Sequence, residues 1–193
     1  MLFRYRKNFT FTLSNKMNSP THAQDKQNLI FLVGMMGTGK STIGKQLAEQ
    51  RKVKFIDSDS EIEKDTGASV SQIFAKEGET YFRDLERAFI SNLNANEPAV
   101  VACGGGLCIP SGMMELLKSK GLVFCLMASV ETLLNRTKTD QSRPLLQVVQ
   151  PLLVLEKLIQ EREPRYLEAD HVIHTDDQTA TEVVKKISEH LSA

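Results

Sequence analysis

Short apolar runs alternate with longer amphipathic stretches along most of the chain. In the longer stretches, apolar residues recur three or four positions apart, which is the period of a helix that buries one face. The short runs predict strands over residues 29–33, 53–57, 99–102, 122–127 and 171–174. The longer stretches predict helices over residues 41–52, 59–66, 70–77, 79–94, 113–118, 130–137, 152–169 and 179–191. This alternation is typical of βαβ units and predicts an α/β fold, with a parallel sheet between two helical layers.

Glycine, proline and polar residues interrupt the pattern at a few places. Gly67 and Gly78 are the expected ends of two helices. Residues 137–151 begin with polar and turn-forming residues and contain Arg143 followed by a proline, so we expect a surface loop there. Residues 152–169 keep the helical period despite Pro164.

Length and charge limit the class of protein. The chain has 193 residues, 41% of them hydrophobic, which predicts one domain with a complete core. The 24 Lys and Arg residues balance the 24 Asp and Glu residues, so no overall field attracts nucleic acid or an anionic membrane. No apolar run approaches the ~20 residues that span a bilayer. We therefore expect no nucleic-acid and no membrane partner, and any anion must bind at a local site.

The cysteines and the first residues bear on location and domain limits. Cys103, Cys108 and Cys125 lie in or beside apolar runs without metal-ligand spacing, which predicts buried, reduced thiols in a cytoplasmic protein. Residues 1–28 are polar and basic, and the first acidic residue is Asp25. We predict a disordered extension over 1–28 and one domain over 29–193. A transit peptide or a wrongly assigned start remains an open alternative.

The most informative motif lies between the first expected strand and the first expected helix. Residues 34–42 read Gly-Met-Met-Gly-Thr-Gly-Lys-Ser-Thr, the spacing G-x-x-x-x-G-K-[ST] whose glycines let backbone N–H groups surround phosphate oxygens. We expect Lys40 to reach the outer phosphates and Ser41 to bind Mg²⁺. A plain glycine turn is the alternative. The predicted ATP-phosphate site comprises Met36, Gly37, Thr38, Gly39, Lys40, Ser41 and Thr42.

Two carboxylates follow the second expected strand. Ligands of open α/β sheets bind outside the carboxyl ends of the strands, so Asp57 and Asp59 are expected at such a site. Asp57 can hold Mg²⁺ through water, and Asp59 can reach the hydroxyl of an acceptor. The alternative is that Asp59 only caps the following helix.

Three glycines follow the third expected strand. Gly104, Gly105 and Gly106 cost backbone entropy and supply no packing, which suggests that a small polar ligand approaches the backbone. A plain turn is the alternative.

Several arginines lie near these segments. A guanidinium binds carboxylate or phosphate through two parallel hydrogen bonds, although most arginines are simply solvated. Glu86 lies three residues after Arg83 on one expected helix, where it either orients the guanidinium or forms a surface pair. The candidate arginines are Arg83, Arg136, Arg143, Arg162 and Arg165.

Seven short motifs follow one another from residue 29 to the C-terminus. They read GMMGTGKST, FIDSD, GETYFRDLE, CGGG, RTKTDQSRPLL, EREPRY and TDDQ. In this order and at these separations they resemble the shikimate kinase family. The resemblance implies a nucleoside-monophosphate-kinase-like P-loop fold with a central five-stranded parallel sheet. It also implies transfer of the γ-phosphate of ATP to the 3-hydroxyl of shikimate, on the pathway to chorismate and the aromatic amino acids.

The same resemblance implies roles for individual residues. It implies that Ser41 and Asp57 hold Mg²⁺, and that Asp59 binds the acceptor hydroxyl and acts as the base. The implied catalytic residues are Asp59, Lys40 and Arg143. The implied shikimate-binding residues are Asp59, Arg83, Gly104, Gly105, Gly106 and Arg162, with the two arginines facing the carboxylate. The implied nucleotide contacts outside the phosphate loop are Arg136 and Gln178 near the adenine and Arg143, which belongs to a mobile lid around 137–151.

Other functions share parts of this pattern. A gluconate kinase has the phosphate loop and a lid but not the complete acceptor set. A nucleoside monophosphate kinase needs a pocket for a base in place of that acceptor set. The sequence argues against a GTPase, because no N-K-x-D motif for guanine follows the phosphate loop. A non-catalytic nucleotide-binding regulator would lack the acceptor residues. We expect a monomer that binds shikimate and ATP with Mg²⁺.

Overall fold

The computed structural model describes residues 27–138 and 150–192. Arg143, most of the predicted lid around 137–151 and nearly all of the predicted extension over 1–28 lie outside the described residues. Every other residue predicted for the site is described.

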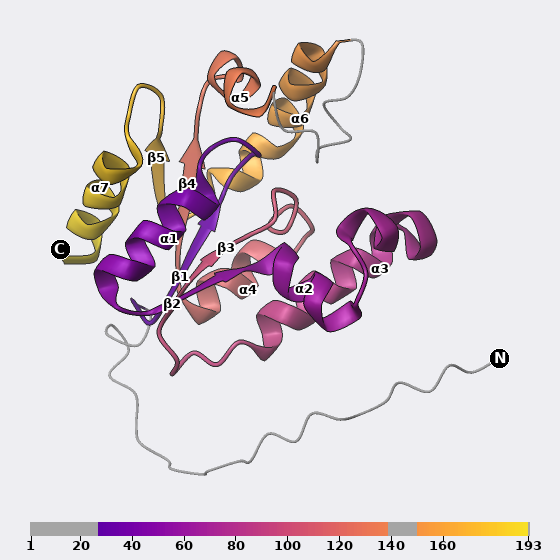
Figure 1. Cartoon of the computed structure of the whole chain (residues 1–193), viewed down its shortest axis with the longest axis horizontal. Helices are drawn as coiled ribbons and strands as arrows, with labels where there is room; N and C mark the ends of the chain where they lie inside the picture. Colours follow the sequence, from indigo (N-terminus) through magenta and orange to yellow (C-terminus); the bar gives the residue numbers. More distant parts are fainter. Residues whose placement is uncertain (1–26, 139–149, 193) are drawn as a thin grey trace.

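Five parallel strands form one sheet at the centre of the domain (Figure 1). The strands are β1 (Leu29–Val33), β2 (Lys54–Asp57), β3 (Ala99–Ala102), β4 (Leu122–Met127) and β5 (His171–His174). Their order is β2-β3-β1-β4-β5, and all four neighbouring pairs are parallel. The predicted parallel sheet is confirmed. Because the strands are parallel, the segments that follow them leave the sheet at one edge.

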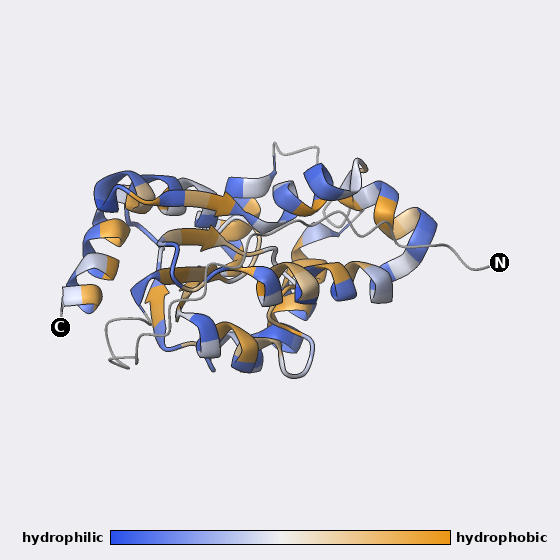
Figure 2. Cartoon of the chain, turned by 90° about the horizontal axis from the view of Figure 1, so that it is seen from below, coloured by the Kyte–Doolittle hydropathy of each residue, from blue (hydrophilic) through white to orange (hydrophobic). Residues whose placement is uncertain are grey.

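Seven helices accompany the strands in the described part of the chain. They are α1 (Lys40–Arg51), α2 (Ser58–Thr66), α3 (Val70–Asn92), α4 (Met113–Lys120), α5 (Val130–Thr137), α6 (Pro151–Tyr166) and α7 (Ala180–Ser192). Figure 2 shows apolar strands between helices whose outward faces are mostly polar. The predicted three-layer arrangement is therefore confirmed.

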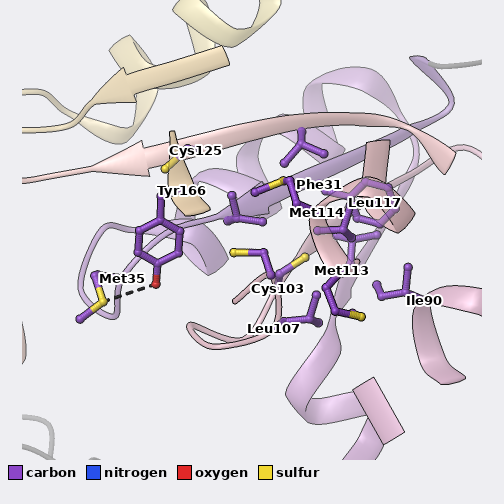
Figure 3. Close-up of a cluster of buried hydrophobic side chains, with 14 of the residues drawn as sticks. Phe31, Met35, Ile90, Cys103, Leu107, Met113, Met114, Leu117, Cys125 and Tyr166 are labelled. Carbon is purple, nitrogen blue, oxygen red and sulfur yellow. Dashed lines mark hydrogen bonds between the residues drawn. The ribbon is translucent and has the colours of Figure 1, made fainter. Parts of the chain in front are cut away.

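The alternation of side chains along β1 divides the core between the two faces of the sheet. Ile30 and Leu32 pack with residues of α1 and α7 on one face. Phe31 and Val33 point to the other face and pack with residues of α3, α4 and α6 (Figure 3). All five residues of β1 are buried, as expected for a central strand of a parallel sheet.

Several helix boundaries differ from the prediction. The structure has one helix, α3, where two were expected, but Gly78 inside it has φ 84° and ψ 175°, so the expected break is present as a kink. Helix α2 begins at Ser58, and its N-cap is Asp57, whose side chain accepts a hydrogen bond from the Ser60 N–H. The capping alternative considered for Asp59 is therefore wrong. Helix α6 ends at Tyr166, three residues before its predicted end at 169.

Among the described residues, no helix is long and apolar enough to cross a membrane.

The first prediction concerns the core between α1 and the sheet. Leu47 of α1 is 0% exposed and belongs to the cluster with Ile30 and Leu32. Leu47→Ala should lower the free energy of unfolding by about 3 kcal/mol, because it removes buried methyl groups and leaves a cavity. Urea unfolding measures this loss. Leu153→Ala on α6 is the control, since Leu153 is 54% exposed and should cost less than ~0.5 kcal/mol. Equal losses in the two variants would contradict the assigned packing.

Candidate active site

Three of the predicted site segments lie at the carboxyl edge of β1, β3 and β2, which are adjacent in the sheet. Leu32 of β1 and Asp57 of β2 both pair with Ala102 of β3, so the three following loops leave the sheet at the same level. The phosphate loop follows β1, the two aspartates follow β2, and the three glycines follow β3. Strand pairing therefore brings together segments that are far apart in the sequence.

The loop between β1 and α1 has the backbone that its glycines permit. Gly34, Gly37 and Gly39 have positive φ values of 132°, 81° and 93°. The Lys40 ammonium group donates hydrogen bonds to the carbonyl oxygens of Gly34 at 2.8 Å and Met35 at 2.9 Å. Helix α1 begins at Lys40, so the loop ends at a helix N-terminus, where N–H groups attract anions.

A hydroxyl and a carboxylate meet beside the start of α1. The Ser41 hydroxyl donates to Asp57 Oδ2 at 3.0 Å, while Asp57 Oδ1 accepts from the Ser60 N–H at 3.3 Å. Oxygen ligands of this kind suit Mg²⁺, which usually takes one or two protein groups and completes its shell with phosphate and water. Among the described residues, no group of three or more His, Cys, Asp or Glu side chains could hold a metal ion alone.

Asp59 lies against the glycine turn. A Cβ atom added at Gly104 would collide with the Asp59 carboxylate. The buried Ser58 hydroxyl accepts a hydrogen bond from the Gly104 N–H at 2.8 Å, which fixes the two loops to each other. Burial raises the pKa of Asp59, and the neighbouring Asp57 raises it further, whereas Lys40 opposes the shift. Asp59 is therefore a partly desolvated carboxylate beside two other charged groups.

Arg83 of α3 lies against the same turn from another side. A Cβ atom added at Gly106 would lie 2.6 Å from Arg83 Nη2. The sequence suggested that the glycines let a ligand approach, and the structure shows that they also make room for Asp59 and Arg83. Any larger residue at 104 or 106 would displace these side chains.

Two carboxylates hold the Arg83 guanidinium. Glu79 accepts at 2.9 Å, and Glu86 Oε2 accepts at 2.7 Å. Glu86 is only 1% exposed, so the alternative of a surface pair is wrong and Glu86 orients Arg83 from inside the protein. Burial raises the pKa of Glu86 to about 7, although Arg83 acts in the opposite direction. The other carboxylate oxygen of Glu86 is buried and has no hydrogen-bond partner within the described residues.

Helix α6 contributes the remaining groups around the glycines. Arg162 Nη1 lies 3.4 Å from the Gly105 carbonyl oxygen. The Tyr166 hydroxyl lies 2.6 Å from the same oxygen. Sequence reasoning included Tyr166 in a motif but gave it no role, because its helical period alone marks it as a core residue.

Arg136 and Gln178 lie beside the turn that follows β5. Arg136 donates to the Thr175 carbonyl oxygen at 2.7 Å and to the Thr175 hydroxyl at 3.0 Å, and it lies 3.4 Å from the Gly37 carbonyl oxygen. Gln178 Nε2 donates to the His174 carbonyl oxygen at 2.6 Å, and Gln178 Oε1 is buried without a partner in the described structure. Both residues lie at the edge of the sheet that carries the phosphate loop. Thr175, which anchors Arg136, had no recognisable signal in the sequence.

The three cysteines take no part in this arrangement. Cys103, Cys108 and Cys125 are free and buried, as predicted. Burial raises the pKa of Cys108 and Cys125 to about 12, so both thiols stay protonated and unreactive.

Comparison with known proteins gives a consistent result. Residues 36–192 match the family model described as shikimate kinase. A shikimate kinase of Vibrio cholerae is 45% identical over 172 residues, which cover 86% of this chain and 98% of that protein. The structure of a shikimate kinase from Acinetobacter baumannii in complex with shikimate superimposes with a TM-score of 0.81 at 40% identity, covering 89% of this chain and 97% of the other.

A more distant neighbour shares the fold. A gluconokinase from Sinorhizobium meliloti has a TM-score of 0.55 at 18% identity and covers 84% of this chain and 94% of its own. Together with the shikimate kinase structures, this likeness confirms the predicted nucleoside-monophosphate-kinase-like P-loop fold.

The second prediction concerns the buried Glu86 carboxyl. Its pKa rises from 4.5 to about 7 in the folded protein, so folding favours the protonated form. The resulting stabilisation is complete below about pH 4.5 and is lost as the pH rises through about 7. The wild type should therefore lose roughly 3 kcal/mol more than Glu86→Gln over this range. Urea unfolding at several pH values measures the difference, with Glu115→Gln on α4 as a control for carboxylate removal. If the wild type instead gained stability relative to Glu86→Gln as the pH rises, Glu86 would be stabilised as the anion.

Proposed function

The chain belongs to the shikimate kinase family, and on this premise we propose how its residues transfer the γ-phosphate of ATP to the 3-hydroxyl of shikimate. The products of the reaction are shikimate 3-phosphate and ADP, on the route to chorismate and the aromatic amino acids. The observation that carries the assignment is the meeting of the phosphate loop, the Asp59 carboxylate and the glycine turn at one edge of the sheet. In this proposal the phosphate loop binds the phosphate donor, Asp59 is the base, and the glycine turn binds the acceptor.

The phosphate loop is proposed to hold the triphosphate of ATP. Backbone N–H groups of residues 36–42 surround its oxygens, and the N-terminus of α1 favours their negative charge. Lys40 already lies over the loop, 2.8 Å from the Gly34 carbonyl oxygen, and is proposed to turn toward the transferred phosphate. Its charge then offsets the charge that develops there. Arg136 and Gln178 are proposed to lie near the adenine.

Ser41 and Asp57 are proposed to hold Mg²⁺ together with the phosphates. Their oxygen atoms are 3.0 Å apart in the structure, and both are ligands that Mg²⁺ accepts. The bound ion would neutralise charge on the phosphate oxygens.

Asp59 is proposed to be the general base. An alcohol is a weak nucleophile, and a carboxylate within hydrogen-bond reach orients its oxygen and accepts its proton. The raised pKa of Asp59 makes it a better proton acceptor than an ordinary carboxylate. Since Gly104 packs against this carboxylate, its position is set before the substrate binds.

Arg83 and Arg162 are proposed to bind the shikimate carboxylate. They approach the glycine turn from α3 and α6: Gly106 contacts Arg83, and Arg162 lies near the Gly105 carbonyl oxygen. A guanidinium pair of this kind recognises a carboxylate by both charge and direction. Gly104, Gly105 and Gly106 are proposed to contact the ring hydroxyls through their backbone.

We also propose that the enzyme acts as a monomer in the cytoplasm. The three free cysteines fit a reducing compartment.

A coupled assay of ADP release tests the function directly. With shikimate as acceptor the purified chain should release ADP, and with gluconate or AMP it should release little above the background. Preference for gluconate would instead indicate a relationship to the distant gluconokinase neighbour that goes beyond the fold.

The third prediction separates the two aspartates. Asp59→Asn keeps the shape of the side chain but cannot accept the proton, so turnover should fall at least ~100-fold while ATP binding survives. Asp57→Asn is the matched variant, and added Mg²⁺ should partly restore its activity. Steady-state kinetics over a Mg²⁺ titration measure both effects. Rescue of Asp59→Asn, and not of Asp57→Asn, would mean that the two roles are exchanged.

The fourth prediction concerns the recognition of the carboxylate by Arg83. Arg83→Lys keeps the charge but loses the planar pair of donors, so the KM for shikimate should rise about 10- to 100-fold with a smaller change in kcat. Arg87→Lys is the control, because Arg87 lies one turn further along α3 and donates to the Ser111 carbonyl oxygen. An unchanged KM in Arg83→Lys would remove this residue from the acceptor site.

A further inference from the structure

The Tyr166 hydroxyl joins three segments of the site. Tyr166 is the last residue of α6 and is 2% exposed. Its hydroxyl lies 2.6 Å from the carbonyl oxygen of Gly105. It also lies 3.4 Å from the sulfur of Met35 in the phosphate loop (Figure 3). A phenol has one hydrogen, and the shorter contact to the stronger acceptor is its hydrogen bond. The contact to the Met35 sulfur, marked by the dashed line in Figure 3, is the longer and weaker of the two.

The glycine turn needs such an anchor because it has no side chains. Three glycines in a row can change the direction of their peptide groups at little cost. Side chains from other elements hold this turn at two atoms: Ser58 binds the Gly104 N–H at 2.8 Å, and Tyr166 binds the Gly105 carbonyl. In a trans peptide the C=O and the next N–H point in opposite directions. By fixing the Gly105 carbonyl toward α6, Tyr166 therefore directs the Gly106 N–H away from α6.

The same hydrogen bond affects Arg162. Arg162 Nη1 lies 3.4 Å from the carbonyl oxygen that Tyr166 already satisfies at 2.6 Å. Arg162 therefore already donates a long hydrogen bond to this partly buried carbonyl, and without the hydroxyl it would become the carbonyl's main donor. Its guanidinium would then be drawn toward the backbone and away from an anionic ligand. Burial raises the pKa of Tyr166 well above its ordinary value, so the hydroxyl remains a donor throughout the neutral range.

We propose that Tyr166 is a positioning residue for the acceptor: its hydroxyl sets the direction of the Gly105–Gly106 peptide and keeps Arg162 available for the carboxylate of shikimate. This inference rests on the proposed function of the glycine turn and of Arg162. It assigns Tyr166 no contact with the substrate, and its effect passes through the two groups that touch the substrate.

Tyr166→Phe tests the proposal, because phenylalanine keeps the ring and its packing but removes the donor. The KM for shikimate should rise about tenfold, as for the loss of one hydrogen bond, while the KM for ATP and kcat change less than about twofold. Tyr81→Phe makes the same chemical change at a residue that is 39% exposed, and its kinetics should match those of the wild type. An unchanged KM for shikimate in folded Tyr166→Phe would overturn the proposal. Changes of equal size in the KM for shikimate, the KM for ATP and kcat would also overturn it.

A second measurement separates positioning from a general loss of stability. Tyr166→Phe is made again in an Arg162→Lys background, where the proposed capture of the guanidinium cannot occur in the same way. Its effect on the KM for shikimate should fall below about threefold there. An effect of full size in both backgrounds would overturn the link to Arg162. If the wild type itself did not phosphorylate shikimate, the proposed function would fail; a shikimate-active wild type with an unaffected Tyr166→Phe variant would disprove this inference alone.

Discussion

The site depends on the parallel pairing of β1, β3 and β2. These strands are adjacent and end at the same level, because Leu32 and Asp57 pair with the same residue of β3. The phosphate loop, the aspartates and the glycine turn must therefore leave the sheet side by side. The long apolar stretch of β1, buried on both faces, fixes the centre of this arrangement. Donor and acceptor groups are thus placed by the core of the protein and not by the loops alone.

Around that edge, the missing side chains of the glycine turn are as important as the charged side chains that are present. Asp59 and Arg83 occupy the space that Cβ atoms at Gly104 and Gly106 would need. Because glycines make the turn flexible, it needs contacts from other elements to hold its conformation. Hydrogen bonds with Ser58 and Tyr166 provide these contacts. The functional groups and the backbone therefore position each other.

The charges of the acceptor side are held in a partly buried network. Glu86 is 1% exposed and lies 2.7 Å from Arg83, while its own pKa is raised to about 7 by burial. Moving a carboxylate from water into the protein interior is unfavourable. The pair of Glu86 and Arg83 therefore contributes more to the orientation of the guanidinium than to the stability of the fold. A guanidinium oriented in this way cannot swing freely into solvent, which suits the recognition of one carboxylate in one direction.

The sequence by itself determined the elements and the chemical inventory of this protein. Apolar periodicity, helix-breaking glycines and the G-x-x-x-x-G-K-[ST] spacing are local features, and local features control backbone conformation. The strands, the phosphate loop and the kink at Gly78 follow from these features. Only the tertiary structure decided that Asp57 and not Asp59 caps α2, that Glu86 is buried, and that Ser58, Tyr166 and Thr175 anchor the functional groups. The Asp57 cap is a bond across three positions, but the other facts depend on contacts between residues far apart in the chain, such as Gly105 and Tyr166, which are separated by 61 positions. Periodicity shows that a tyrosine is buried, but the order of the strands and the packing of α6 decide which carbonyl oxygen its hydroxyl meets.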